Sequence, residues 1–301
     1  MPYSRYRPMH QVEPQTFDSL PVAIGGVGGS GTRLIADIMM QLGFELGTDL
    51  NGPNDNLAFS FLFKRAELWP LDDHREELNQ ALELFFNAMY FHRPLTVQER
   101  EFITKLALIG RPPHAADWPP ARAAALLQQS ADQTRPKLWG WKEPNTHIFL
   151  PALIERVPGM KYIHVVRHGL DMAHSDNQSQ LLLWGQALTN KTPSDSNPGN
   201  SFDYWCAAHQ RILSIGATME SNFYLLNYDK FCSKPEGELE KLLKFLELKP
   251  EAQLINKILD EVEAPASIGR HREQARLAIT DSQRSLLVRL GFNADWADTS
   301  N

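Results

Sequence analysis

The residues with the clearest chemical potential lie in the run Ile24-Gly-Gly-Val-Gly-Gly-Ser-Gly-Thr-Arg33. This run joins a short apolar segment to an apolar-periodic one, which predicts a strand, a glycine-rich turn and the first turn of a helix. Glycines allow several backbone N–H groups to converge on one ligand, and a helix N-terminus adds unpaired N–H groups and partial positive charge. Ser30 and Thr32 add two hydroxyl donors. The run therefore predicts a binding site for a phosphate or sulfate group.

Arg33 occupies the first turn of the predicted helix. A cation there opposes the helix dipole unless an anion lies between them, so its position favours a bound anion. The alternative is a strand–helix turn without a ligand, in which Arg33 pairs with Asp37 one turn later. An arginine that precedes its acidic partner is the weaker order of charges for such a pair.

Two common nucleotide motifs do not fit this run. Counted from Gly26, four residues lead to the next motif glycine, but Thr32 and Arg33 then stand where a Walker A loop requires Lys and Ser or Thr. The stretch Gly26-Val-Gly-Gly-Ser-Gly31 fits a dinucleotide fingerprint. The segment roughly twenty residues later, Asn51-Gly-Pro-Asn-Asp55, is a turn and not a strand end that presents an acid to a ribose. Both an ordinary P-loop ATPase and a dinucleotide site are therefore disfavoured.

A second basic motif lies in the run Lys161-Tyr-Ile-His-Val-Val-Arg-His-Gly-Leu-Asp-Met-Ala-His-Ser175. It places Arg167 at the end of a predicted buried strand and Ser175 on the helix predicted to follow. The planar guanidinium suits a phosphate, and a nearby hydroxyl completes such a site. Considered alone, Arg167 is equally suited to capping carbonyl groups, and Ser175 to bonding the preceding helical turn.

Composition limits the classes of ligand. The chain has 301 residues and a formal net charge of −6, so a surface that coats nucleic acid is disfavoured and any polyanionic ligand needs a local basic site. The two cysteines, Cys206 and Cys232, have no C-x-x-C spacing, which predicts reduced thiols and no metal cluster. His164 and His168 would lie ~13 Å apart on a continued strand, too far apart to share one metal ion.

No part of the sequence resembles a membrane segment. The first twenty residues carry charges and prolines, and no later window has the apolar length that crosses a bilayer. We therefore expect a cytoplasmic protein without a membrane span and without a nucleic-acid partner. The sequence does not determine the oligomeric state.

Four apolar runs end in turn or polar signals and predict parallel strands covered on both faces. They are Val22–Ile24, Leu138–Trp141, Tyr162–Val166 and Phe223–Leu226. Helical patterns follow the first three of them, at Thr32–Leu42, Phe149–Arg156 and Leu170–Leu183. This alternation predicts an α/β fold with a doubly wound parallel sheet that binds ligands at the carboxyl ends of its strands.

We interpret residues 1–301 as a single α/β domain with two interruptions. Residues from about 55 to 135 form a helical insertion, with helical patterns at Asp72–Tyr90 and Thr96–Ile109. Residues from about 185 to 202 form a mobile loop, because Thr189–Ser201 is rich in Pro, Ser, Asn and Gly and has no periodicity. Aromatic residues of the insertion either line an apolar acceptor pocket or form its core: Trp69, Phe85, Phe86 and Tyr90.

Together, the two motifs resemble those of sulfotransferases that use 3′-phosphoadenosine 5′-phosphosulfate (PAPS), and the chain is identified as a bacterial-type member of that family. The resemblance extends over most of the chain and implies a P-loop-like, three-layer fold. Arg167 and Ser175 have the eight-residue spacing of the family's 3′-phosphate motif. The segment Trp139-Gly-Trp-Lys-Glu-Pro144 resembles the element that brings a lysine, here Lys142, toward the sulfate. The 5′-phosphosulfate loop of the family corresponds to Gly28, Gly29, Ser30, Gly31, Thr32 and Arg33.

Two further segments are similar to family elements. Ser267-Ile-Gly-Arg-His-Arg272 resembles the late basic loop that closes over the 3′-phosphate, which makes Arg270 a second candidate for that contact after Arg167. The segment Asn227-Tyr-Asp-Lys-Phe231 resembles the one that follows the fourth strand. Tyr228 there lines the adenine side or serves as a core aromatic residue.

The resemblance implies in-line transfer of a sulfuryl group from PAPS to a hydroxyl or amine, which leaves adenosine 3′,5′-bisphosphate and needs no metal. The acceptor is a small molecule, a carbohydrate or a peptide. By analogy with phosphoryl transfer, the loop N–H groups, Lys142 and Arg33 would stabilise negative charge. Glu143, beside Lys142, is our candidate for the general base, with Asp37 and His147 as competitors.

One position departs from the family pattern, because many relatives carry Lys or Arg where this chain has Gly29. Either Lys142 and Arg33 compensate, which we favour, or the protein binds the nucleotide and transfers slowly. Two alternatives to a sulfotransferase stay open at this point. One is a P-loop-type nucleotide-dependent phosphotransferase, and the other is a non-catalytic nucleotide-binding module.

Overall fold

A four-stranded, fully parallel sheet forms the centre of the molecule, with the strand order β2-β1-β3-β4. The computed structural model describes residues 14–112, 114–129, 134–191 and 195–294. The strands are β1 (Val22–Gly26), β2 (Gly140–Lys142), β3 (Lys161–Val166) and β4 (Phe223–Asn227). All four predicted strands are therefore present, and each carboxyl end faces the same edge of the sheet.

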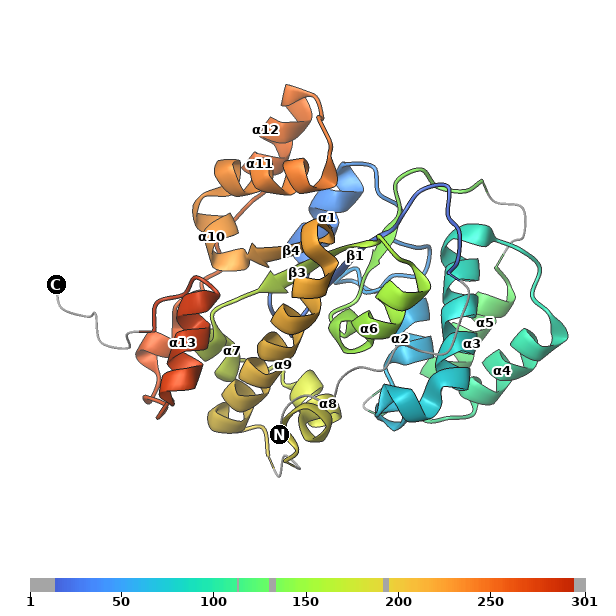
Figure 1. The fold of residues 1–301 in the computed structure, drawn as a ribbon, viewed down its shortest axis with the longest axis horizontal. Coiled ribbons are helices and arrows are strands. Elements are labelled where there is room, and N and C mark those ends of the chain that lie inside the picture. The colour runs from blue at the N-terminus through green and yellow to red at the C-terminus, as the bar shows by residue number, and fades with distance from the viewer. Residues whose placement is uncertain (1–13, 113, 130–133, 192–194, 295–301) are drawn as a thin grey trace.

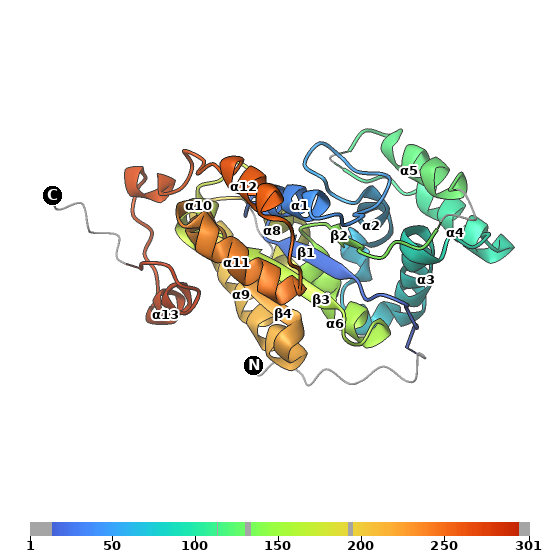
Figure 2. The same ribbon diagram turned by 90° about the horizontal axis from the view of Figure 1, so that it is seen from above.

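Helices cover both faces of the sheet, as Figures 1 and 2 show. One face packs against α1 (Thr32–Gln41), α10 (Tyr228–Ser233), α11 (Pro235–Leu246) and α12 (Ala252–Asp260). The other packs against α6 (Thr146–Arg156) and α9 (Pro198–Met219). Val22 and Ile24 enter the first core and Ala23 enters the second, because successive strand side chains point to opposite faces. The predicted three-layer α/β fold is confirmed.

Four helices between β1 and β2 form a lobe at one side of the sheet (Figure 1). They are α2 (Leu57–Phe63), α3 (Arg75–Phe86), α4 (Val97–Ala107) and α5 (Trp118–Leu127). Aromatic rings join this lobe to the sheet: the Phe85 and Trp141 centroids are 5.1 Å apart, and those of Phe59 and Trp141 are 6.2 Å apart. Phe85, Phe86 and Tyr90 are fully buried in this shared core. The lobe and one face of the sheet therefore share a single hydrophobic core.

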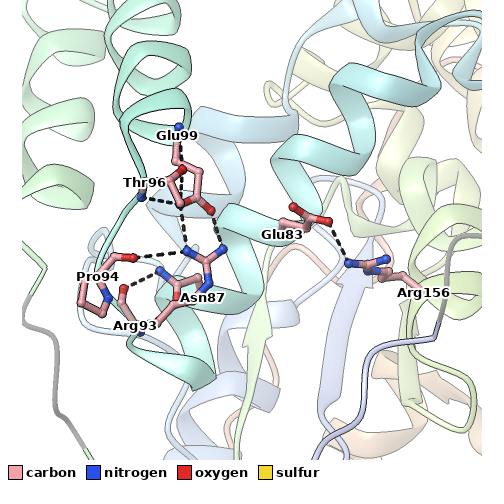
Figure 3. A network of polar contacts seen from close by, with 7 residues as sticks. All are labelled: Glu83, Asn87, Arg93, Pro94, Thr96, Glu99 and Arg156. Carbon is pink, nitrogen blue, oxygen red and sulfur yellow. Dashed lines mark hydrogen bonds and ion pairs between the residues drawn. The ribbon is translucent and has the colours of Figure 1, made fainter.

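Polar contacts fix the helices of the lobe to one another and to α6 (Figure 3). Thr96 and Glu99 form a reciprocal capping box that starts α4, and Arg93 donates to both Glu99 carboxylate oxygens at 2.8 and 2.5 Å. Arg156, the last residue of α6, contacts Glu83 of α3 at 3.1 Å. The Arg156–Glu83 pair thus joins α3 of the lobe to the C-terminal end of α6.

The prediction of one helix over Leu170–Leu183 is wrong. The structure has two helices, α7 (Gly169–Ala173) and α8 (Ser179–Thr189), and Ser175 lies in the turn between them. Polar side chains bond to the local backbone there: Asn177 N donates to Ser175 Oγ at 3.3 Å, and Gln178 Nε2 to Ser175 O at 2.7 Å. Such bonds compete with the helical backbone pattern and end α7.

The loop predicted from about 185 to 202 is shorter than expected. Helix α8 continues to Thr189, and α9 begins at Pro198, whose N-cap Asn197 accepts from the backbone N–H of Asn200 at 2.9 Å. The N-cap and the proline at N1 are both signals for the start of a helix. The loop was predicted over them because the segment has no apolar periodicity. Residues 192–194 of the predicted loop lie outside the described residues. The C-terminal part of the chain adds α13 (Asp281–Arg289).

Candidate active site

The glycine loop lies between the carboxyl end of β1 and the first turn of α1. Gly29 and Gly31 have φ values of 88° and 93°, in the left-handed region that L side chains rarely adopt. A Cβ on Gly31 would also overlap the ring of Tyr228. Gly31 is the N-cap of α1 and gives it no side-chain cap. Glycine is therefore required for this loop, and it leaves the helix N-terminus open to a ligand.

The loop presents hydrogen-bond donors that the described protein does not use. Ser30 N–H donates to Val27 O at 3.0 Å, but the N–H groups of residues 28, 29 and 31–33 have no backbone acceptor among the described residues. The Ser30 Oγ is buried and also lacks a partner within them. A buried polar group without a partner costs about 1–3 kcal/mol. These donors fit the acceptor oxygens of a phosphate or sulfate group.

Arg167 lies directly after β3, at the carboxyl edge of the sheet. Its buried guanidinium is 5.8 Å from the Tyr228 ring centroid, and the same ring would meet a Cβ on Gly31, so Tyr228 lies close to both Arg167 and the glycine loop. Arg167 Nη2 donates to Ser267 Oγ at 2.8 Å, whereas its Nε is 3.9 Å from Asp229 Oδ1 and makes no hydrogen bond among the described residues. Burial raises the pKa of Asp229 to about 6, against the opposing charge of Arg167. The pair is therefore loose.

Ser175 and Arg270 lie beside the same edge. The Ser175 Oγ would be 3.6 Å from a Cβ on Gly29, so it faces the glycine loop although it lies outside a helix. Arg270 Nη1 donates to His174 O at 3.3 Å, and its Nε donates to Ser267 O at 3.3 Å. The structure thus brings the predicted phosphate contacts of three distant segments together at the carboxyl ends of β1 and β3.

Lys142 ends β2 and is not a free cation. Its side chain is 2% exposed, and Nζ donates to Pro53 O at 3.0 Å and pairs with the Asp55 carboxylate. Asp55 Oδ2 also accepts from Asn51 Nδ2 at 2.9 Å. Asn54 Nδ2, in the same turn, donates to Asp37 Oδ1 on α1 at 2.6 Å. The turn at 51–55 therefore connects the end of β2 to the helix that follows the glycine loop.

Glu143 is enclosed and fully hydrogen-bonded. The residue is 1% exposed, and its carboxylate accepts from the backbone N–H of Asn145 at 2.5 Å, from Asn145 Nδ2 at 2.9 Å and from Ser60 Oγ at 3.3 Å. Burial raises its pKa, and the nearby positive charge of Lys64 opposes this effect. Asn145 Oδ1 in turn accepts from Trp184 Nε1 at 2.8 Å. Glu143 therefore orders the turn from β2 into α6.

A profile of the sulfotransferase family matches residues 21–252, which include the glycine loop, Lys142 and Arg167. The chain belongs to the sulfotransferase family. It is a PAPS-dependent enzyme that transfers a sulfuryl group, and the phosphotransferase and non-catalytic alternatives are not favoured. No curated protein matches the chain.

Solved structures similar to this sulfotransferase include three bacterial-type proteins of low identity. The sulfotransferase domain of the Synechococcus PCC 7002 olefin synthase is 16% identical, with 93% of this chain and 99% of that chain covered and a TM-score of 0.48. The domain from the curacin biosynthetic pathway is 16% identical, with coverages of 91% and 99% and a TM-score of 0.46. Sulfotransferase STF1 of Mycobacterium tuberculosis H37Rv is 14% identical, with coverages of 91% and 76% and a TM-score of 0.42. Among the described residues of this sulfotransferase, no helix has both the length and the apolar character needed to cross a bilayer.

Two other predicted site residues of the sulfotransferase, Arg33 and His147, differ in exposure. The Arg33 side chain is 67% exposed, and its Nε is 3.9 Å from Asp37 Oδ2, which is the pairing of our alternative interpretation. His147 is completely buried, and burial lowers its pKa to about 3. Its Nε2 is 3.2 Å from Gln180 Oε1, and Gln180 Nε2 donates to Gly26 O at 3.1 Å. His147 thus supports Gly26, where the glycine loop begins, through Gln180.

Sequence reasoning missed three residues that shape the site: Asp55, Gln180 and Ser267. Each meets its partner across at least 87 residues of chain, so no local spacing marks it. Asp55 stands in the turn at 51–55, which we recognised as a turn without a chemical role. The one local signal was its position directly after a glycine–proline turn.

Proposed function

We propose that the sulfotransferase binds PAPS across the carboxyl ends of β1 and β3. The 5′-phosphosulfate would be held by the glycine loop, whose contributing residues are Gly28, Gly29, Ser30, Gly31 and Thr32. The observation that carries this proposal is the set of donors that lack partners among the described residues at one edge of the sheet. The buried Ser30 Oγ and the loop N–H groups belong to the glycine loop, the Arg167 Nε follows β3, and Tyr228 contacts both the loop and Arg167.

The 3′-phosphate would be bound by Arg167, with Ser175 and Arg270 completing its surroundings. Arg167 offers a planar set of donors that suits a phosphate, and its present ion-pair contact with Asp229 is 3.9 Å long and easily exchanged for a better one. Tyr228 would then contact the nucleoside between the two phosphate positions.

Bound PAPS supplies an activated sulfuryl group joined through an oxygen to its 5′-phosphate. The protein holds donor and acceptor in line and stabilises the negative charge on the oxygen that leaves. Lys142 is our candidate for this stabilisation, because it is a buried ammonium at the end of β2, next to the strand that carries the loop. It would compensate for Gly29, whereas the exposed Arg33 would add only a distant charge.

We propose Asp55 instead of Glu143 as the general base. The Asp55 side chain is 21% exposed, whereas Glu143 is 1% exposed and accepts three hydrogen bonds from the protein. A base must reach the proton of the acceptor hydroxyl or amine, and Asp55 has the access. Asp55 would accept this proton, while Lys142, which contacts the same carboxylate, would stabilise the oxygen that leaves.

The test is transfer of labelled sulfate from PAPS to a panel of hydroxyl and amine compounds. We expect Asp55→Asn to lower kcat by ~10²-fold, in the range that general-base catalysis contributes. Glu143→Gln should change kcat less than about threefold and lower Tm, because it weakens the turn into α6. Asp18→Asn, which removes an exposed carboxylate paired with Arg135, is the matched control. An inactive Glu143→Gln beside an active Asp55→Asn would return the role to Glu143.

We propose that the acceptor enters by a cavity of about 470 Å³ between α8 and the short helix at Ala66–Leu68. Trp69 and Trp184 line it, which suits a small molecule, carbohydrate or peptide with an apolar or ring-bearing part. Trp184 connects through Asn145 to Glu143, beside the proposed reactive pair. Trp69→Ala should therefore raise KM for the acceptor and leave the affinity for adenosine 3′,5′-bisphosphate unchanged.

We also propose a cytoplasmic location. Both cysteines are buried and free, as expected in a reducing compartment. Fractionation of cells that produce the tagged full chain would test this location directly.

A further inference from the structure

A single carboxylate fastens the late basic loop, residues 267–272, to helix α7. Asp171 on α7 is 1% exposed and accepts three hydrogen bonds from that loop. Its Oδ2 accepts from the backbone N–H of Gly269 at 2.6 Å, and its Oδ1 accepts from the backbone N–H of His271 at 3.0 Å. The third contact joins His271 Nδ1 to Asp171 Oδ1 at 2.6 Å. These bonds bridge about 100 residues of sequence, so they fix the loop in a way that chain connectivity does not.

The attachment is stiff on both sides. Gly269 has a φ of 83°, a conformation that L side chains rarely adopt and that turns its N–H toward Asp171. The His271 ring stacks on His168 with centroids 4.3 Å apart and an interplanar angle of 16°. His168 Nε2 in turn contacts Asn293 O at 3.0 Å. Burial would raise the pKa of Asp171, but the bonds from His271 and Gly269 lower it to about 2, so the anchor stays charged at neutral pH.

The fastened loop carries two of the residues that surround Arg167. Ser267 accepts from Arg167 Nη2 at 2.8 Å, and Arg270 stands between the two residues whose backbone N–H groups Asp171 binds. Arg270 also donates to His174 O, next to Ser175. Asp171 itself lies four residues after Arg167 and four before Ser175. One buried carboxylate therefore sets the spacing between the loop and both residues of the 3′-phosphate motif.

We propose that Asp171, acting through His271 and Gly269, is a positioning residue that sets the preference of this enzyme for a nucleotide with a 3′-phosphate. The inference rests on the proposed function, which assigns the 3′-phosphate to Arg167. Without the carboxylate, Arg270 and Ser267 keep their chemistry but lose their fixed position beside Arg167. The glycine loop does not depend on this anchor, so recognition of the 5′ end stays intact.

The experiment compares two nucleotides that differ only at the 3′ position. Calorimetric dissociation constants are measured for adenosine 3′,5′-bisphosphate and for adenosine 5′-phosphate, on the wild type and on Asp171→Asn. We expect Asp171→Asn to lower the affinity for the bisphosphate by at least tenfold and the affinity for the monophosphate by less than threefold. Arg270→Gln should reduce the same preference. Expressed as free energies, the loss of bisphosphate affinity in the double variant should be smaller than the sum of the losses in the two single variants, because both changes act through one contact.

Asp203→Asn is the matched control, because Asp203 also joins other segments to its helix, through Lys191 and Gln283, and these contacts involve neither Arg167 nor the late basic loop. It should leave the ratio of the two constants unchanged. If Asp171→Asn does not fold, His271→Gln replaces it with the same expected change in the ratio. An equal effect on both nucleotides, or none, would show that Asp171 is merely structural and would overturn the inference. Failure of the folded wild type to bind the bisphosphate would instead reject the proposed function.

Discussion

The two ends of the proposed reaction site differ in how far the protein satisfies its own polar groups. On the donor side, the Ser30 hydroxyl and the Arg167 Nε lack hydrogen-bond partners among the described residues. At the end of β2, where the transfer would occur, Lys142 pairs with Asp55, and Glu143 accepts three hydrogen bonds. The donor side is thus prepared for a ligand, whereas the residues at the end of β2 are held by contacts within the protein.

This difference predicts which substitutions should change the affinity for the nucleotide and which should change kcat. Unpaired donors in a rigid loop gain their full hydrogen bonds when an anionic ligand arrives, so changes there should act on affinity. An ion pair that already exists gains less from binding and more from a change in charge during the reaction, so changes there should act on kcat. Each prediction below tests one part of this division.

The largest effect is expected for Lys142→Met. Loss of one preorganised charge-stabilising donor costs ~10²–10³-fold in kcat, while the donor loop stays intact and the affinity for adenosine 3′,5′-bisphosphate should change less than about threefold. Steady-state kinetics with labelled PAPS and calorimetry on the same samples measure both quantities. Lys161→Met, which removes a strand lysine paired with Glu247, is the matched control. A variant that loses affinity and rate together would contradict the division.

An intermediate effect is expected for Asp229→Asn. The folded-state pKa of Asp229 is raised to about 6, mainly by burial, so the folded protein binds an extra proton between about pH 4 and pH 6. Ionisation of Asp229 therefore reduces stability as pH rises through this window, and above pH 6 the carboxylate competes with a phosphate for Arg167. At pH 7.5 the variant should bind adenosine 3′,5′-bisphosphate about three- to tenfold more tightly than the wild type, and at pH 5 the two should be equal. Equal affinities at both pH values would show that Asp229 does not face the ligand.

The smallest effect is expected for Arg33→Ala. The side chain is 67% exposed and makes one contact of 3.9 Å, and such surface pairs contribute ~0–1 kcal/mol. We expect less than a threefold change in kcat and in nucleotide affinity, with Arg100→Ala on α4 as the control. A tenfold loss of kcat would restore Arg33 to the catalytic role that the sequence suggested.

The sequence predicted the sheet well because buried parallel strands are continuous apolar runs. The structural strand β3 (Lys161–Val166) differs from its prediction by one residue, and β1 (Val22–Gly26) by two. Glycine spacing likewise identified the loop before any coordinates. The break between α7 and α8 falls in the polar run 174–180, which the predicted helix Leu170–Leu183 spanned. Side-chain bonds at Ser175 and Asn177 interrupt the helical backbone there.

Contacts between residues that are far apart in the sequence could not be predicted from the sequence alone. Nothing local in Lys142 or Asp55 shows that the two side chains meet, and nothing local in Asp171 shows that it holds a loop about 100 residues later. The position of Glu143 beside Lys142 suggested reactivity, and the sequence does not show that Ser60 and Asn145 bond to its carboxylate. Residue type and spacing predict where a site lies, and packing decides which of its groups are accessible.

The most direct test of the account is calorimetric titration of the folded protein with adenosine 3′,5′-bisphosphate, for the wild type and for Arg167→Ala. It requires no knowledge of the acceptor. We predict one site per chain and a loss of affinity of at least tenfold in the variant, about 1.4 kcal/mol, with Arg100→Ala unchanged. A folded wild type that does not bind the nucleotide, or equal affinities for wild type and Arg167→Ala, would contradict the proposed donor site.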